Sequence, residues 1–368
     1  MPTHYIDEFA DEFGPEKIIH IYEPKSKLKA IVVIDNLSLG PSLGGCRMAP
    51  DVTTKEVFRL ARAMTFKNAL NGIPHGGGKS GIIADSKTEN KETIIREFAQ
   101  AIKDLRDYIP GPDMGTDETC MAYIHDEIRR AVGLPKVIGG IPLDELGMTG
   151  YGLAVSADVA CEELNLPLSG ARVVIQGYGN VGRAAAKFLA ERDAKVIATC
   201  NSKGGIFNPN GLDLTRLNEY IENNHSVQNP DLGKPISNAE LLEVESDIFI
   251  PAARPDVFNE SNQGVLKTRL VLEGANIPIT ADAAKSIHDR GIAIVPDVIA
   301  NSGGVICAAT EYQRMAEAQA FERVKASISR NTAEVLKRIR EKKQYPHDAA
   351  KEMARERLAQ AMSYRGHM

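Results

Sequence analysis

The segment from residue 171 to residue 201 constrains the fold most, because it joins a strand, a glycine-rich turn, a helix and a second strand. It reads ARVVIQGYGNVGRAAAKFLAERDAKVIATCN. In such a turn the first glycine allows the tight bend, the second admits phosphates to the backbone, and the third lets the helix pack on the strand. The helix N-terminus then offers amides and its dipole to an anion. We therefore predict a Rossmann-type dinucleotide site formed by Gly177, Gly179, Asn180, Val181 and Gly182.

Two readings of this segment remain open. A purely structural tight turn could carry the same glycines. The position after the second strand, which often holds an acid that binds the ribose of NAD, is Asn201, followed by Ser202 and Lys203. A neutral residue beside a lysine tolerates a 2′-phosphate, although Asn201 could simply cap a turn. The expected cofactor is therefore NAD or NADP.

The rest of the chain predicts an α/β protein of two domains, which suits its 368 residues. Apolar strands alternating with helices favour a parallel, helix-covered sheet in the second half; these strands are 171–176, 195–200, 246–250, 269–272 and 292–295. Strands at 28–36 and 81–84 and a helix at 53–70 indicate a mixed first domain. The Gly- and Pro-rich stretch 135–152 is the expected boundary.

We accordingly expect a mixed-sheet substrate-binding and oligomerisation domain over 1–137, joined by C-terminal helices over about 331–368. The Rossmann dinucleotide-binding domain is expected over 138–330. Short edge strands in the first domain suggest a homo-oligomer.

Composition excludes several classes of partner. With 44 Lys and Arg against 49 Asp and Glu, the net charge is −5, and no basic, aromatic-rich stretch suggests nucleic acid. No apolar run approaches the roughly 20 residues that span a bilayer, so we expect a cytoplasmic protein with no membrane partner. The five cysteines are scattered, which predicts reduced thiols and no metal site.

Two lysines and an aspartate are the candidates for chemistry in the first domain. Lys67 stands at the edge of the apolar stripe of helix 53–70, where it either reaches solvent or awaits an anion. Lys79 lies in PHGGGKSG, where glycines allow close approach to a ligand. Poor hydration and a second ammonium nearby would help this amine act as a base; a flexible loop with a solvated lysine is the alternative. The GxxxxGK[ST] spacing of a Walker loop is absent.

Asp113 lies in the stiff segment YIPGPDMGT, before a helix expected to begin near Thr116. Asp117 and Glu118 are explained as first-turn acids that the helix dipole favours. Asp113 precedes that turn, so its carboxylate is the better catalytic candidate, with a turn-capping role as the alternative.

Taken together, these segments resemble the glutamate/leucine/phenylalanine/valine dehydrogenase family along nearly the whole chain. The segments that carry the resemblance are GPSLGGCRMAP (40–50), FKNALNGIPHGGGKSGI (66–82), GPDMGT (111–116), TGYG (149–152), QGYGNVG (176–182), SKGGIFNPNGLD (202–213), LEGAN (272–276) and NSGGV (301–305). The resemblance implies reversible, NAD(P)-dependent oxidative deamination of an L-amino acid to its 2-oxo acid and ammonia.

The resemblance also implies roles for single residues. Lys67 would bind the substrate α-carboxylate, Lys79 would activate water, and Asp113 would move protons to and from the amino group. Asn301 resembles the residue that holds substrate and nicotinamide in register. Further cofactor contacts implied are Thr149, Ala253 and Asn276. A homo-oligomer, hexamer or octamer, is expected.

Side-chain preference follows from two replacements. Members that take glutamate carry a Lys just before the GG of the GGxR segment and a Ser after NxGG; here these positions hold Leu43 and Ala308. Burying a γ-carboxylate without a partner is costly. An apolar pocket is therefore expected; its residues are Leu43, Gly44, Gly111, Val305 and Ala308. Branched-chain or aromatic substrates are the main expectation.

Glutamate is the alternative, since Arg314 could serve an acidic side chain unless it is a solvated helix residue. A non-catalytic dinucleotide sensor is the alternative from another class. Turnover of reduced cofactor with a 2-oxo acid and ammonium separates an enzyme from such a sensor.

Overall fold

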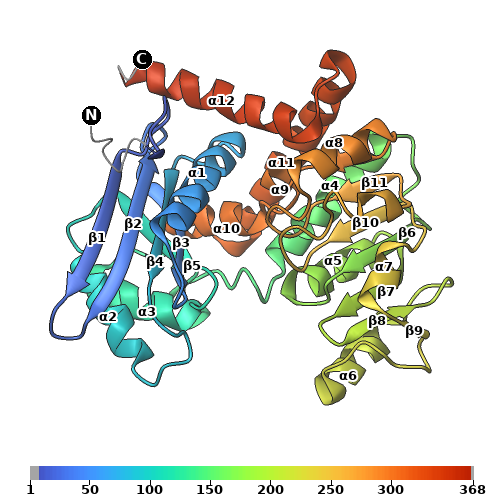
Figure 1. Ribbon diagram of the computed structural model, residues 1–368, viewed down its shortest axis with the longest axis horizontal. Coiled ribbons are helices and arrows are strands. Elements are labelled where there is room, and N and C mark those ends of the chain that lie inside the picture. The colour runs from blue at the N-terminus through green and yellow to red at the C-terminus, as the bar shows by residue number, and fades with distance from the viewer. Residues whose placement is uncertain (1–7, 366–368) are drawn as a thin grey trace. The chain divides into compact units, whose positions relative to one another are not determined.

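A computed structural model of the chain describes residues 8–365 and divides it into two compact units (Figure 1). The first unit runs to Pro142 and includes Val305–Phe321 and the chain from Ala354 onward. The second comprises Leu143–Gly304 and Glu322–Met353. This partition differs from the expected one, which gave residues 331–353 to the first domain and residues 305–321 to the second.

Packing explains where the segment 322–353 belongs. In the second unit the helix α4 (Met148–Glu163) places Ser156 within 3.1 Å of Thr332. A Cβ on Gly152 of α4 would lie 2.6 Å from the side chain of Ile328. Residues 328 and 332 lie one turn apart in α11 (Glu317–Lys342), so one face of this helix packs on α4.

The first unit is built on a five-stranded mixed sheet. Its strand order is β1-β2-β4-β3-β5, with β1, β2 and β4 antiparallel in turn and β3 parallel to both β4 and β5. The strands are β1 (Lys17–Glu23), β2 (Leu28–Asn36), β3 (Ser42–Met48), β4 (Gly76–Ile82) and β5 (Tyr108–Pro112). The mixed sheet expected in the first domain is thereby confirmed.

Helices cover both faces of this sheet. Ile31 and Val33 of β2 pack with Val57 of α1 (Thr54–Leu70) on one face. Val32 and Ile34 form a core with the opposite helices, which are α2 (Lys91–Ala101) and α3 (Glu118–Ile128). Strand alternation produces these two cores because successive side chains point to opposite faces.

The glycine run at 76–78 forms a buried strand rather than a flexible loop. The sequence predicted a strand only at 81–84, whereas β4 spans Gly76–Ile82 and all seven of its residues are buried. A Cβ on Gly77 would lie 2.1 Å from the Thr65 hydroxyl of α1. The missing side chain thus lets α1 lie directly on the strand that carries Lys79.

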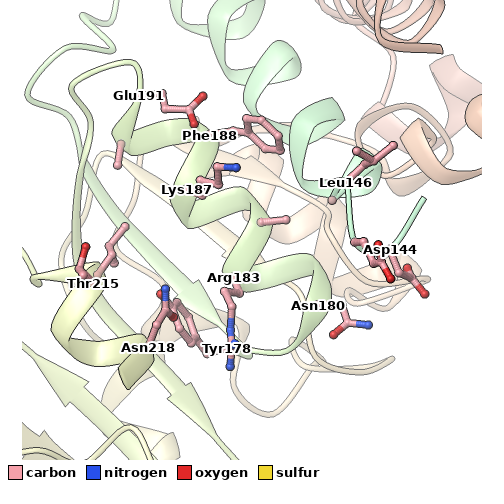
Figure 2. A pocket seen from close by; sticks show the side chains of 15 residues that line it. Asp144, Leu146, Tyr178, Asn180, Arg183, Lys187, Phe188, Glu191, Thr215 and Asn218 are labelled. Carbon is pink, nitrogen blue, oxygen red and sulfur yellow. The ribbon is translucent and has the colours of Figure 1, made fainter. Parts of the chain in front are cut away.

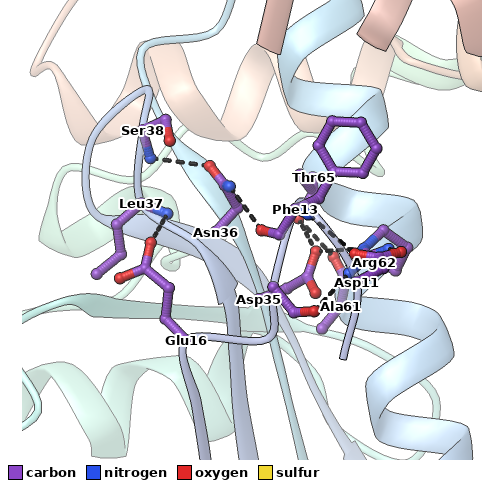
Figure 3. A network of polar contacts seen from close by, with 11 residues as sticks. Asp11, Phe13, Glu16, Asp35, Asn36, Leu37, Ser38, Ala61, Arg62 and Thr65 are labelled. Carbon is purple, nitrogen blue, oxygen red and sulfur yellow. Dashed lines mark hydrogen bonds and ion pairs between the residues drawn. The ribbon is translucent and has the colours of Figure 1, made fainter. Parts of the chain in front are cut away.

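A polar network fixes α1 against the sheet and the N-terminal segment (Figure 3). The Nε of Arg62 lies 2.8 Å from the carboxylate of Asp35, which is fully buried at the end of β2. Arg62 also pairs with Asp11, and Thr65 donates a hydrogen bond to Asp35. Burial raises the pKa of Asp35, although Arg62 and Thr65 oppose this.

The second unit contains a seven-stranded sheet in the order β12-β11-β10-β6-β7-β8-β9. Five strands are parallel, as predicted: β6 (Arg172–Gln176), β7 (Lys195–Asn201), β10 (Ile248–Pro251), β11 (Leu270–Leu272) and β12 (Ala293–Val295). An antiparallel extension, β8 (Gly204–Phe207) and β9 (Lys234–Ile236), was not predicted. The Rossmann-type fold is confirmed.

Short helices connect these strands. They are α5 (Asn180–Ala190), α6 (Leu214–Asn224), α7 (Asn238–Leu242), α8 (Ala281–Asp289) and α9 (Asp297–Ala300). The chain continues with α10 (Gly303–Tyr312), α11 and α12 (Pro346–Tyr364). Single 3₁₀ turns are η2 (Lys136–Ile138) and η3 (Gln263–Val265). Within residues 8–365, no helix combines the length and apolarity that crossing a membrane requires.

Candidate active site

Lys79 and Asp113 meet in the first unit. Lys79 projects from β4, Asp113 follows β5, and the Lys79 Nζ lies 2.8 Å from the Asp113 Oδ2. Gly45 of β3 leaves the room they occupy, because a Cβ there would lie 2.7 Å from the Asp113 Cβ and 2.9 Å from the Lys79 Nζ. The Nε of Arg47 stands 3.3 Å from the same carboxylate oxygen. The sequence did not single out Arg47.

Neighbouring cations stabilise the ionised form of Asp113. Burial alone raises the pKa of Asp113, but Lys79 and Arg47 outweigh it, so the pKa is lowered from its usual value. Lys79 is only 8 % exposed. A buried carboxylate and ammonium in contact can exchange a proton with a ligand that enters between them.

Lys67 lies in the last turn of α1, half-buried. Met64, one turn earlier, would stand 3.4 Å from a Cβ at Gly44. Asn68, the next residue, donates hydrogen bonds to the carbonyls of Leu43 and Gly76. This turn of α1 therefore lies over the expected substrate residues Leu43 and Gly44.

The other residues of the expected side-chain pocket also belong to the first unit. Gly111 of β5 pairs with Gly45 of β3. Val305 and Ala308 lie one turn apart on α10, with Ala308 buried. Arg314, the alternative partner for an acidic side chain, is exposed beyond the end of α10.

The glycine turn of the second unit fits a dinucleotide pyrophosphate. Gly177 adopts a φ of +101°, and a Cβ on Gly182 would lie 1.8 Å from the Gly177 carbonyl oxygen. A Cβ on Gly179 would meet no protein atom within 4 Å, so the backbone there is open to a ligand. Helix α5 begins at Asn180, where its first amides can bind an anion.

Strand order places this turn where ligands bind in doubly wound folds. β6 lies between β7 and β10, so the order of the parallel strands reverses there. A Cβ on Gly177, after β6, would lie 2.7 Å from the Cβ of Ala253, which follows β10. Ala253 therefore lies against the turn, as a cofactor contact would.

Asn276 and Asn301 are also brought together in the second unit. The Asn301 Nδ2 donates hydrogen bonds to the Ala275 carbonyl at 3.0 Å and to the Asn276 Oδ1 at 3.1 Å. Thr149 adjoins the same region, since a Cβ on Gly304 would lie 3.1 Å from its hydroxyl. These three predicted contacts thus lie on segments that pack together.

A contact between Glu273 and His347 that the sequence did not reveal supports this region. The carboxylate of Glu273 is fully buried and lies 3.0 Å from the Nε2 of His347. It also accepts a hydrogen bond from the Asp297 amide. Burial lowers the pKa of His347, but Glu273 outweighs burial and the pKa is raised.

The residues expected to select between NAD and NADP mainly shape their own loop. The Asn201 side chain accepts a hydrogen bond from the Lys203 amide and donates one to the His225 carbonyl. The Lys203 amine donates to the Asn224 carbonyl. These contacts match the turn-capping role that the sequence left open for Asn201, and Ser202 lies exposed between them.

Figure 2 shows a cavity of about 550 Å³ beside α5, bounded by the loop 144–147 and the start of α6. Asn180 and Tyr178 line it, together with Arg183 and Lys187 of α5. The three glycines of the turn do not line it. The cavity therefore adjoins the expected pyrophosphate site, with which it shares Asn180.

The fold and the two sites define a nicotinamide-dependent dehydrogenase. The family model described as Glutamate/Leucine/Phenylalanine/Valine dehydrogenase matches residues 139–366, and the model for the family's dimerisation domain matches residues 15–130. The chain belongs to this family and is an NAD(P)-dependent amino-acid dehydrogenase.

Several similar proteins have names that specify a substrate. A glutamate dehydrogenase of Aeropyrum pernix is 37% identical over 90% of this chain and 85% of its own. An NADP-specific glutamate dehydrogenase of Saccharolobus shibatae is 40% identical over 75% of this chain and 69% of its own. The hetero-hexameric glutamate dehydrogenase of Thermus thermophilus, in a leucine-bound form, superposes with a TM-score of 0.86 at 26% identity, covering 95% of this chain and 90% of that one.

These names bear on the substrate that the sequence predicted. The expected amino-acid dehydrogenase with NAD or NADP is confirmed. The expected preference for an apolar side chain is not supported, because both relatives are named for glutamate. The alternative, glutamate, is favoured.

Proposed function

We propose that this dehydrogenase interconverts L-glutamate with 2-oxoglutarate and ammonia. The observation that carries the chemistry is the contact between the buried Lys79 and the partly buried Asp113, 2.8 Å apart. The relatives named above support the choice of glutamate. Fold alone would not decide a substrate, since one fold supports many specificities.

In this proposal Asp113 and Lys79 divide the proton transfers. Asp113 starts as a carboxylate, because the neighbouring cations lower its pKa. It accepts a proton from the substrate ammonium, and the neutral amine becomes an iminium ion when the Cα hydride leaves for the cofactor. Lys79, in contact with Asp113, then accepts the proton of the water that adds to this iminium ion. Asp113 finally returns a proton to the nitrogen, so that ammonia leaves.

Binding and orientation fall to other residues. Lys67 pairs with the α-carboxylate in this proposal, and its helix turn lies over Leu43 and Gly44. The turn at Gly177, Gly179 and Gly182 would hold the pyrophosphate. Asn276 and Asn301 would hold the nicotinamide end. When bound, the nicotinamide ring accepts the hydride that leaves the substrate Cα.

A second candidate substrate is an apolar amino acid, which Leu43 and Ala308 favour. Leu43 is 2 % exposed and Ala308 is 6 % exposed, and neither can bind a carboxylate. A branched-chain side chain would fill such a pocket at little cost, whereas an unpaired γ-carboxylate would be strongly disfavoured. The substrate assay must therefore decide between glutamate, which the relatives favour, and an apolar amino acid, which Leu43 and Ala308 favour.

The assay compares kcat/KM for L-glutamate, L-leucine, L-valine and L-phenylalanine, each with NAD and with NADP. We expect glutamate to be preferred. A higher kcat/KM for a branched-chain or aromatic amino acid would reverse the assignment and leave the dehydrogenase class intact. The two cofactors are compared in the same panel.

We also propose that the enzyme is a homo-oligomer. The match of residues 15–130 to a dimerisation domain supports this, and β1 offers an exposed sheet edge to a second copy. A hexamer agrees with the assembly named for the Thermus thermophilus relative.

A further inference from the structure

His75 is a buried imidazole with one nitrogen unused. It is 3 % exposed, and its Nδ1 lies 3.0 Å from the Pro41 carbonyl. Among residues 8–365, no group hydrogen-bonds to its Nε2. An unsatisfied polar atom buried in this way has a cost, and such atoms call for a ligand or another explanation.

His75 lies one residue before β4, where its ring contacts Pro41, two residues before Leu43 in the neighbouring chain segment. Leu43 pairs with Gly77 across β3 and β4, and residues paired in a sheet share a face. A Cβ on Gly77 would point at Thr65, so this is the face covered by α1. By strand alternation, Lys79 lies on the same face two residues after Gly77, and His75 lies just before the strand begins, two residues before Gly77. Gly77, which has no side chain, lies between His75 and Lys79.

Helix α10 approaches His75 from the other side. The ring of Tyr312 packs edge-on against the imidazole, with the centroids 5.4 Å apart. Tyr312 lies one turn beyond Ala308 and two turns beyond Val305, so the three share one helix face. His75 therefore contacts the segment that leads to Leu43 and the helix face that carries Ala308, the positions where the glutamate-type Lys and Ser are missing.

We propose that His75 is a specificity-determining residue whose Nε2 donates a hydrogen bond to the side-chain carboxylate of the substrate. The inference rests on the proposed function, because it requires an acidic substrate. Tyr312 is 36 % exposed at the end of α10, and the proposal requires its side chain to turn aside and uncover the imidazole. His75 thus supplies the cation that Leu43 and Ala308 cannot.

A pH dependence follows from the bond to Pro41. The Nδ1 donates its hydrogen to that carbonyl, so the Nε2 carries a hydrogen only when the ring is protonated. Burial lowers the pKa of His75, partly opposed by the Pro41 carbonyl, and Tyr312 is the titratable group packed on the ring. The free ring is therefore neutral at pH 7 and above. Binding a carboxylate takes up one proton, so affinity falls as pH rises.

The test measures binding, so it does not depend on turnover. Calorimetry on the NADPH-loaded enzyme gives dissociation constants for glutarate, which has both carboxylates of glutamate, and for 4-methylpentanoate, which has one. We expect His75→Leu to weaken glutarate binding by about tenfold to a hundredfold, which corresponds to one hydrogen bond to a charged group. The affinity for 4-methylpentanoate should be unchanged. Retained 4-methylpentanoate binding shows that the variant folds.

Two further variants sharpen the result. His75→Gln keeps an amide donor and should bind glutarate more tightly than His75→Leu, without the pH dependence. His125→Gln changes a partly buried histidine of α3 and should match the wild type. Above pH 6.5 the wild-type ratio of the two affinities should fall by up to about tenfold per pH unit.

Unchanged glutarate binding in His75→Leu, or a wild-type ratio independent of pH, would overturn the inference. Failure of the proposed function looks different. In that case the wild type binds glutarate through His75 but does not oxidise glutamate.

Discussion

Withdrawal from water makes an aspartate harder to ionise, and the partly buried Asp113 shows how neighbouring cations reverse this. Burial raises the pKa of Asp113, and Lys79 at 2.8 Å and Arg47 at 3.3 Å lower it. The effect of the two cations is the larger, so the pKa lies below its usual value. Arg47 also pairs with Glu56 of α1, which holds the guanidinium in place. Arg47 is therefore a positioning residue for the charge on Asp113.

Removing the Arg47 charge should move the acid side of the pH profile. In Arg47→Gln the pKa of Asp113 rises, so Asp113 becomes protonated at a higher pH than in the wild type. The acid limb of kcat/KM for glutamate should shift upward, by about one pH unit. Arg47→Lys keeps a cation, so its acid limb should lie close to that of the wild type. Coincident acid limbs in the wild type and Arg47→Gln would exclude this role.

For single residues, the sequence predicted which side chains take part in the site better than it predicted which side chains they contact. Lys79 and Asp113 stood out because glycines and prolines surround them, and the structure joins them. Arg47 was missed although it lies in the quoted segment 40–50, because nothing local shows that β3 runs between β4 and β5. His347 was missed for a similar reason, since its partner Glu273 is 74 positions earlier.

The same glycine-rich composition produces two different elements here. At 76–78 it forms a buried strand, since Gly77 admits α1. At 177–182 it forms the turn 177–179 after β6 and the first residues of α5. The turn was predicted because a strand and a helix flank it. The strand was only half predicted, because glycine has a low intrinsic preference for strands and only packing favours it here.

The turn offers a test of cofactor binding that leaves the fold intact. Gly179→Ala adds a methyl group that meets no protein atom within 4 Å, and Gly179 has a negative φ of −88°. The melting temperature should therefore stay unchanged. Binding of NADPH and NADH, followed by fluorescence, should weaken by about tenfold or more, because the methyl group occupies the phosphate position.

Gly264→Ala is the matched control, since its added methyl group also points into open space, in η3. It should alter neither stability nor binding. Full cofactor affinity in Gly179→Ala would remove the pyrophosphate from this turn.

Over the whole molecule, the sequence predicted two α/β units and the parallel sheet, but not how the C-terminal helices divide. Periodicity identifies a helix and its apolar face, yet it does not say which other face that helix meets. Residues 331–353 join the second unit because Thr332 and Ile328 pack on α4. The substrate expectation was drawn from two replaced residues, and the compensating cation that it weighed was Arg314 rather than the proposed His75.

The whole account depends on Lys79 working with Asp113 on the substrate. The most direct measurement is single-turnover and steady-state kinetics of Lys79→Ala with glutamate, beside NADPH titration of the same variant. We predict a fall in kcat of about a hundredfold to ten-thousandfold, with cofactor affinity unchanged because the glycine turn lies in the other unit. Lys91→Ala, which removes a lysine paired with Asp117, should keep full activity. Wild-type turnover in Lys79→Ala would contradict the central claim.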